Sequence, residues 1–212
     1  MNFTNNLADP ELFASGVMNG KNWNAAQQER LLKQLEETLK PSRFRHTIAV
    51  AKEAVKLAEC HGEDQGKAQL AALFHDMAKG FSVDDMNRMA AEAGLPKQYQ
   101  NRPNLAHSKL AVVMMQRDYG ITDQELLDAV AYHTTGRAGM TKLDQILFLA
   151  DAIEPARKYP GVERIRTLSY EDLDKACIRS LERTVEYIRE KGEYLDPDTE
   201  AAKDDLKEKL KL

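Results

Sequence analysis

Apolar residues recur every three to four positions from Asn24 to the end of the chain, whereas alternating apolar and polar positions are nearly absent. The first spacing is typical of amphipathic helices and the second of half-buried strands. The sequence therefore predicts an all-α fold, a bundle of helices joined by short loops.

A first helix is indicated by the stripe Leu31, Leu35 and Leu39, and Pro41 ends it because proline cannot continue a helix. The residues before this helix are polar and have no clear period. We therefore expect residues 1–41 to be an N-terminal extension with one helix. Such a helix is better suited to packing, or to an arm of a homodimer, than to catalysis.

Helix-start signals and glycines divide the remaining sequence into seven further helices. They are predicted to begin at Ser42, Asp64, Ser82, Leu105, Thr122, Thr141 and the Ser169–Asp172 pair. Thr122 with Glu125 forms a capping-box pattern. The helix from Asp64 is expected to run to Gly80, and the last helix to about Gly192.

The chain is thus expected to consist of three parts: the extension, a main domain over residues 42–199, and a charged tail over residues 200–212. The tail has the composition of a surface helix or a frayed end.

Composition places the chain among ordinary globular proteins, with 42% hydrophobic and 30% charged residues in a length of 212. No apolar stretch approaches the roughly 20 residues of a membrane span, and no export signal is seen, so we expect a cytoplasmic protein with no membrane partner. Cys60 and Cys177 are too few for a disulfide framework and are expected to be reduced. The net charge of -4 disfavours binding to duplex nucleic acid.

Several ionisable residues lie on the apolar faces of predicted helices, where an unpaired charge is costly to bury. They are His46, His75, Asp76, His107, His133 and Asp151. A single histidine in such a position is usually a hydrogen-bonded core residue. Six such groups on five helices point instead to a shared cation. His61, beside Gly62 at a predicted helix end, is expected to be solvated.

Two imidazoles and two carboxylates, from His46, His75, Asp76 and Asp151, would neutralise a divalent ion and leave two octahedral positions open. Such a site suits iron or manganese better than structural zinc. Open positions are typical of catalytic metals, whereas structural sites are closed.

Five segments together resemble the HD-domain phosphohydrolases, and among them the bacterial YqeK family of symmetrical dinucleoside tetraphosphatases. They are Arg43–His46, His75–Lys79, His107, His133–Arg137 and Leu149–Arg157. The resemblance extends from Arg43 to Thr199. It implies an all-helical HD-domain bundle, an iron-containing site, and cleavage of diadenosine tetraphosphate into two ADP.

The resemblance also implies roles for individual residues. The metal ligands would be His46, His75, Asp76 and Asp151. The catalytic residues would be Asp76, Lys79, His107 and His133. The substrate would be held by Arg43, Lys79, His107, His133, Thr134, Arg157, Tyr194, Leu195, Asp196, Pro197, Asp198 and Thr199. The chain departs from the family at Ala156, where glycine is usual, and in its first 41 residues.

Some alternatives stay open at this point. His107 and His133 could bind phosphate, protonate the leaving ADP, or hold a second metal. Arg137 could contact phosphate or lie on the loop surface. The rival functions are an HD-type nucleotidase or nucleoside triphosphate phosphohydrolase, and a non-catalytic sensor of dinucleoside polyphosphates. The expected partners are a dinucleoside polyphosphate or a nucleoside diphosphate.

Overall fold

The computed structural model describes residues 17–18 and 21–212. Ten α-helices make up most of this part of the chain: α1 (Ala25–Thr38), α2 (Pro41–His61), α3 (Gln65–Phe74), α4 (Val83–Glu92), α5 (Pro103–Tyr119), α6 (Gln124–Tyr132), α7 (Lys142–Ile153), α8 (Val162–Glu171), α9 (Leu173–Lys191) and α10 (Pro197–Leu210). Two 3-10 helices, η3 (Met77–Gly80) and η4 (Lys97–Tyr99), lie between them. Two-residue strands, β1 (Val17–Met18) and β2 (Lys21–Asn22), pair antiparallel. The all-α prediction is confirmed.

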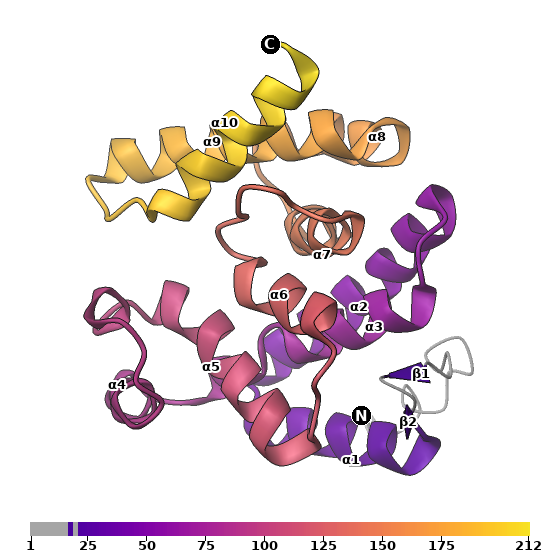
Figure 1. Ribbon diagram of the computed structural model, residues 1–212, viewed down its shortest axis with the longest axis vertical. Coiled ribbons are helices and arrows are strands. Elements are labelled where there is room, and N and C mark those ends of the chain that lie inside the picture. Colours follow the sequence, from indigo (N-terminus) through magenta and orange to yellow (C-terminus); the bar gives the residue numbers. More distant parts are fainter. Residues whose placement is uncertain (1–16, 19–20) are drawn as a thin grey trace.

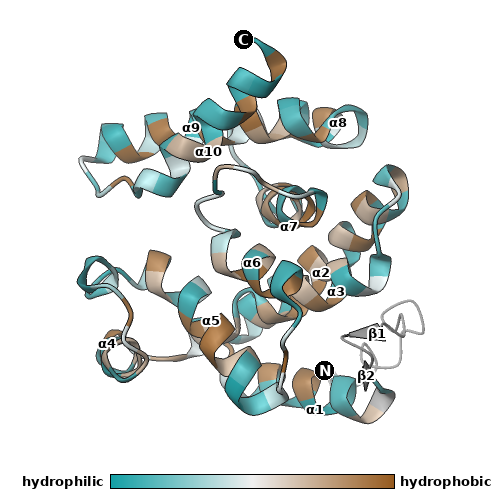
Figure 2. Cartoon of the chain, viewed as in Figure 1, coloured by the Kyte–Doolittle hydropathy of each residue, from teal (hydrophilic) through white to brown (hydrophobic). Residues whose placement is uncertain are grey.

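Helix α7 lies at the centre of the bundle (Figure 1). It packs against α2, α3 and α6 on one side and against α8 and α9 on the other. Leu143, Ile146, Leu147 and Leu149 of α7 are fully buried. Apolar residues are concentrated in the inner helices, and the outer helices α9 and α10 carry more polar residues (Figure 2). This apolar centre fixes the relative positions of the helices that carry the candidate site.

Several predicted helix boundaries are confirmed by capping contacts. The side chains of Asp64, Ser82 and Thr141 each accept a hydrogen bond from the backbone N–H three residues later. Gly62 and Gly192 end α2 and α9 in the left-handed conformation, where glycine has no steric penalty.

Two predicted helix starts were wrong. Helix α2 begins at Pro41, not after Ser42, and has no side-chain cap. Proline suits the first helical position because its fixed φ is already helical and its missing N–H would be unpaired there. Helix α6 is capped by Asp123, whose carboxylate accepts from the N–H of Leu126, rather than by Thr122.

Two predicted helices are divided in the structure. The helix predicted from Asp64 to Gly80 ends at Phe74, and η3 follows after a turn at His75 and Asp76. The segment before α9 forms a separate helix, α8, which the prediction missed. Ser169 lies inside α8, where its hydroxyl donates to the carbonyl of Ile165. Asp172 alone caps α9.

The flanking helices share the core of the main domain. Leu31, Leu35 and Leu39 of α1 are buried, and so are Ala202 and Leu206 of α10. The predicted tail therefore includes a packed helix. Of the extension predicted over residues 1–41, residues 1–16 and 19–20 lie outside the described part of the chain.

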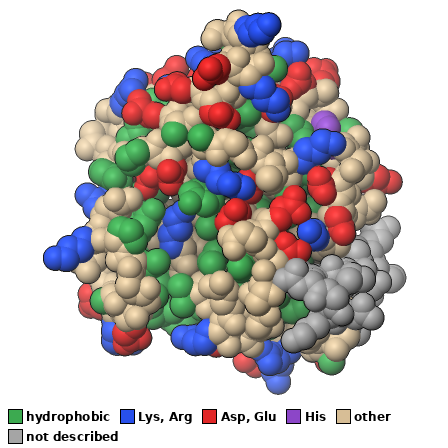
Figure 3. Space-filling view, in the orientation of Figure 1, with side chains coloured by type: hydrophobic (Ala, Val, Ile, Leu, Met, Phe, Trp, Pro, Cys, Tyr) green, Lys and Arg blue, Asp and Glu red, His purple; other side chains and the backbone are tan. Residues whose placement is uncertain are grey.

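The face drawn in Figure 3 carries both signs of charge. Lys and Arg side chains are interspersed with Asp and Glu on the face drawn in Figure 3. Among the described helices, none is both long enough and apolar enough to cross a membrane.

Candidate functional site

Four histidines converge from four helices, each with its Nδ1 held from outside the cluster. Nδ1 of His75 lies 2.6 Å from the carbonyl oxygen of Ala72, that of His107 lies 3.0 Å from Pro103 O, and that of His133 lies 2.8 Å from Val130 O. A carbonyl oxygen only accepts, so Nδ1 carries the hydrogen in these three rings. For His46 on α2 the partner is a carboxylate oxygen of Glu154, at 3.1 Å. The four Nε2 atoms are thereby free to face the interior of the cluster.

Asp76 lies in the centre of this cluster, in the turn between α3 and η3. Its Oδ1 is 3.2 Å from His107 Nε2 and 4.0 Å from His133 Nε2. Its Oδ2 is 3.4 Å from His75 Nε2 and 2.9 Å from the guanidinium of Arg43. The end of α3 at Phe74 makes this placement possible, because a continued helix would turn consecutive side chains to different faces.

Asp151 approaches from α7, with Oδ1 3.0 Å from Nε2 of His46. The guanidinium of Arg157 forms an ion pair with the same oxygen and donates through Nε to the Asp151 carbonyl, at 2.8 Å. The loop after α7 thus returns to the cluster.

The donor set suits a metal ion. His46, His75 and Asp76 form one group whose ligand atoms lie within 4.8 Å of one another. His75, His133 and Asp151 form a second, and Asp76, His107 and His133 a third. Within the described part of the chain, Nε2 of His46 and of His75 is buried and has no hydrogen-bonding partner, although carboxylate oxygens lie 3.0 and 3.4 Å away. Buried polar atoms are normally paired, so two unpaired nitrogens beside two carboxylates are what a metal site requires.

The electrostatic environment shifts the pKa values of His75, His107 and His133 in different directions. Burial alone would lower the pKa of His75, but the carboxylates of Asp76 and Asp151 outweigh burial and raise it. Burial, assisted by the neighbouring His75 and His107, lowers the pKa of His133 to about 3. Burial also lowers the pKa of His107. Burial would raise the pKa of Asp76, yet the neighbouring imidazoles of His75 and His107 hold it well below its usual value.

Three basic residues border the cluster. Arg43 pairs with Asp76, and Arg157 pairs with Asp151. Lys79 in η3 donates to the side-chain oxygen of Asn104 at 3.3 Å, and burial lowers the pKa of its ammonium group. These side chains add positive charge at the edge of a site that could bind an anion.

Two residues considered from the sequence have other partners. Arg137 forms ion pairs with Asp144 at 2.8 Å and with Asp128 at 3.4 Å, and neither carboxylate belongs to the cluster. His61 is half-buried and lies 2.7 Å from the carbonyl of Ser169, so the expectation of a solvated residue was wrong.

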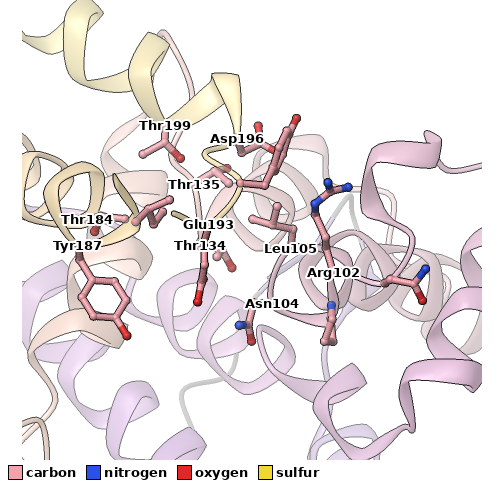
Figure 4. Close-up of a pocket in the computed structure, with 14 residues that line it drawn as sticks. Arg102, Asn104, Leu105, Thr134, Thr135, Thr184, Tyr187, Glu193, Asp196 and Thr199 are labelled. Atoms are coloured by element: carbon pink, nitrogen blue, oxygen red, sulfur yellow. The ribbon is translucent and has the colours of Figure 1, made fainter. Parts of the chain in front are cut away.

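A pocket of about 440 Å³ lies next to the cluster, between the start of α5 and the turn joining α9 to α10 (Figure 4). Thr134 lines it, and its hydroxyl is 3.3 Å from Nε2 of His133. Tyr194, Asp196 and Thr199 line it as well, whereas Leu195, Pro197 and Asp198 are not among the lining residues.

Sequence reasoning missed several residues here. Arg102, Asn104 and Tyr187 also line the pocket, and the guanidinium of Arg102 lies 4.2 Å from the ring centre of Tyr194. No local sequence pattern indicates that these three residues line a pocket. Glu154 was also missed as the partner of His46, although it lies within the recognised segment around Asp151.

The chain is similar to several known proteins. The model of the HD domain family matches residues 43–156. The symmetrical bis(5'-nucleosyl)-tetraphosphatase of Bacillus subtilis is 38% identical over 173 residues, which cover 81% of this chain and 93% of that protein. The Staphylococcus aureus protein of the same name is 37% identical, with 79% and 87% covered. A crystal structure of an HD superfamily hydrolase from Clostridium acetobutylicum, described as involved in NAD metabolism, has a TM-score of 0.82 and 32% identity, with 86% of this chain and 97% of that chain covered.

Proposed function

The chain belongs to the HD-domain family and has symmetrical bis(5'-nucleosyl)-tetraphosphatases as relatives, and on that premise we propose that it hydrolyses diadenosine tetraphosphate to two ADP. In this reaction, a bond from the central bridging oxygen to one inner phosphorus breaks, and the oxygen of water joins that phosphorus. The observation that carries the proposal is the convergence of four imidazoles and two carboxylates beside three basic side chains and a pocket.

We propose that His46, His75, Asp76 and Asp151 hold a single iron ion. The unpaired Nε2 atoms of His46 and His75 support this assignment, as does the balance of two carboxylate charges against a divalent ion. A divalent metal in such a site supplies Lewis acidity, which polarises a phosphoryl oxygen and makes water more acidic.

The protein's own residues would bind and orient the tetraphosphate. Arg43, Lys79 and Arg157 would contact its oxygens, since charge-assisted hydrogen bonds are strong and phosphoryl transfer spreads negative charge over these oxygens. His107 and His133, beside Asp76, would lie against the central phosphates. The nucleoside would occupy the pocket at Thr134 and the segment Tyr194–Thr199.

Product analysis tests the proposal directly. The purified full-length protein is incubated with diadenosine tetraphosphate and Fe²⁺, Mn²⁺ or a chelator, and the nucleotides are separated by chromatography. We expect ADP alone as the product, with no reaction in the chelator.

Other products would contradict the proposal in distinguishable ways. Equal amounts of AMP and ATP would indicate asymmetrical cleavage. Turnover of nucleoside mono- or triphosphates in preference to the tetraphosphate would indicate a nucleotidase or triphosphate phosphohydrolase. Binding without any product would indicate a sensor.

A further inference from the structure

Among the four converging histidines, His46 alone has a side-chain carboxylate as the partner of its outer nitrogen. The other three rings donate from Nδ1 to backbone carbonyls within their own helical turns. Glu154, which comes 108 positions after His46, lies just past the end of α7 and is only 3% exposed. The outer nitrogen of the His46 ring is therefore held by a residue from a distant part of the chain.

Both oxygens of the Glu154 carboxylate are engaged. Oε1 lies 3.1 Å from Nδ1 of His46, and Oε2 accepts from the backbone N–H of Ala156 at 2.7 Å. An ionised carboxylate only accepts hydrogen bonds, so Glu154 favours the ring hydrogen on Nδ1, while Asp151 Oδ1, 3.0 Å from Nε2, competes for it when no cation lies between them. With the hydrogen on Nδ1, Nε2 of His46 presents a lone pair to the cluster, which is the form that binds metals.

The position of Glu154 is itself fixed by α8. Arg166 donates from its guanidinium to the carbonyls of Ile153 at 2.8 Å, Glu154 at 3.0 Å and Arg157 at 2.8 Å. Three hydrogen bonds from one side chain hold the turn that carries both Glu154 and Arg157. These hydrogen bonds from α8 restrict the backbone from which the Glu154 side chain extends toward His46.

We propose that Glu154 is a positioning residue that holds His46 as its Nδ1–H tautomer and aims Nε2 at the metal. The carboxylate is on the far edge of the ring, and Glu154 belongs to none of the three groups that could hold an ion. It therefore acts through His46 and not as a ligand. Carboxylate partners of this kind orient metal-binding histidines and increase their basicity. The inference rests on the proposed function only in taking the cluster as the metal site.

Replacement of Glu154 by glutamine should disturb its hydrogen bond with His46, although the two side chains have the same shape. The amide has one oxygen and one NH₂ group, but both neighbours, Ala156 N–H and His46 Nδ1–H, are donors. One of the two hydrogen bonds must be lost, or His46 must move its hydrogen to Nε2 and so lose its ligand lone pair. We therefore expect Glu154→Gln, although isosteric, to weaken Mn²⁺ binding by about 10- to 100-fold, and Glu154→Ala to weaken it similarly.

Glu53→Gln is a matched control. Glu53 is also a buried glutamate, on the same helix as His46 and about two turns away, and it accepts a hydrogen bond from the hydroxyl of Tyr170 at 2.8 Å. Its replacement removes a buried charge without touching the cluster. We expect its Mn²⁺ affinity to equal that of the wild type.

Two measurements on the full-length chain test the proposal. Binding of Mn²⁺ alone is followed by the paramagnetic resonance signal of the free ion. The ring-nitrogen chemical shifts of His46, recorded on metal-free protein at a pH of about 8.5 where ordinary imidazoles are neutral, report the tautomer. We expect Nδ1–H in the wild type and loss of that tautomer in Glu154→Gln.

Two results would overturn the proposal: Mn²⁺ affinity within about twofold of wild type in both Glu154 variants, or an Nε2–H tautomer of His46 in the wild type. If Glu154→Ala does not fold, the Mn²⁺ affinity of Glu154→Gln and the His46 tautomer of the wild type still test the proposal. Since neither measurement uses a nucleotide, this inference and the proposed reaction can fail separately.

Discussion

The Nε2 atoms of His107 and His133 lie 3.1 Å apart, and the other nitrogen of each ring is bound to a backbone carbonyl. Two neutral rings held in this way turn lone pairs toward each other. Burial lowers the pKa of both imidazoles, so an added proton is disfavoured. The hydroxyl of Thr134 lies 3.5 Å from Nε2 of His107 and 3.3 Å from that of His133, so the two rings share one donor and act as a unit.

We predict that replacements of these two histidines are not additive. If each single variant, His107→Gln and His133→Gln, removes the shared contact, the double variant should lose little more activity than either. The coupling measured by turnover of diadenosine tetraphosphate should be roughly 0.5–3 kcal/mol. A cycle that pairs His133→Gln with Arg179→Ala, on the outer helix α9, is the control and should be additive. Additive losses in both cycles would show that the two rings act independently.

Removal of either carboxylate, by Asp76→Ala or Asp151→Ala, should abolish turnover and lower the content of bound metal. Each carboxylate supplies one of two negative charges that balance a divalent ion. Metal analysis of the purified variants, with Asp144→Asn as a control at a buried carboxylate outside the three candidate groups, measures this effect. Full metal content in Asp151→Ala would remove Asp151 from the proposed ligands.

Lys79→Ala and Arg157→Ala should retain the metal but weaken nucleotide binding or turnover. A charge-assisted hydrogen bond contributes about 1.5–3 kcal/mol, which corresponds to a loss of about 10- to 150-fold. Arg179→Ala is a suitable control, because its side chain is 60% exposed and its one ion pair with a described residue is to Glu182, at 4.0 Å. Steady-state kinetics that match the wild type in both site variants would mean that these cations do not contact substrate.

The pocket wall at Tyr194 should contribute to nucleoside binding. Deletion of the whole C-terminal segment is unsuitable as a test, because Ala202 and Leu206 of α10 are buried in the core. Tyr194→Ala removes only the ring, and we expect the Michaelis constant for diadenosine tetraphosphate to rise by about tenfold while metal content stays constant. Tyr170 is equally exposed, at 39%, but lies on α8 away from the pocket. If Tyr194→Ala and Tyr170→Ala behave alike, the ring has no part in binding.

The two cysteines should differ in reactivity. Burial raises the pKa of the Cys177 thiol well above its usual value, so very little reactive thiolate forms there, whereas Cys60 is exposed. At a pH of about 8, a colorimetric thiol reagent should modify one thiol in the native protein and both after denaturation. The native reaction should disappear in Cys60→Ser. Rapid modification of Cys177 in the native state would contradict its burial.

The sequence by itself determined those features that depend on neighbouring residues. Asp64 and Thr141 cap helices through N–H groups three positions away, so the pattern of the two residues already contains the contact. The inward orientation of His46 and Asp151 was predictable in the same way, because a 3.6-residue period assigns each position to one face of its helix. Family resemblance supplied the expected roles of these residues.

Tertiary structure decided the partners that come from distant parts of the chain. It set Glu154 against His46, paired Arg137 with Asp144 and Asp128, and enclosed the pocket between α5 and the turn before α10. A helical period specifies which way a side chain faces but not which side chain it meets there. That choice follows from how the helices pack around α7, where the burial of apolar surface fixes distances and angles that no local pattern contains.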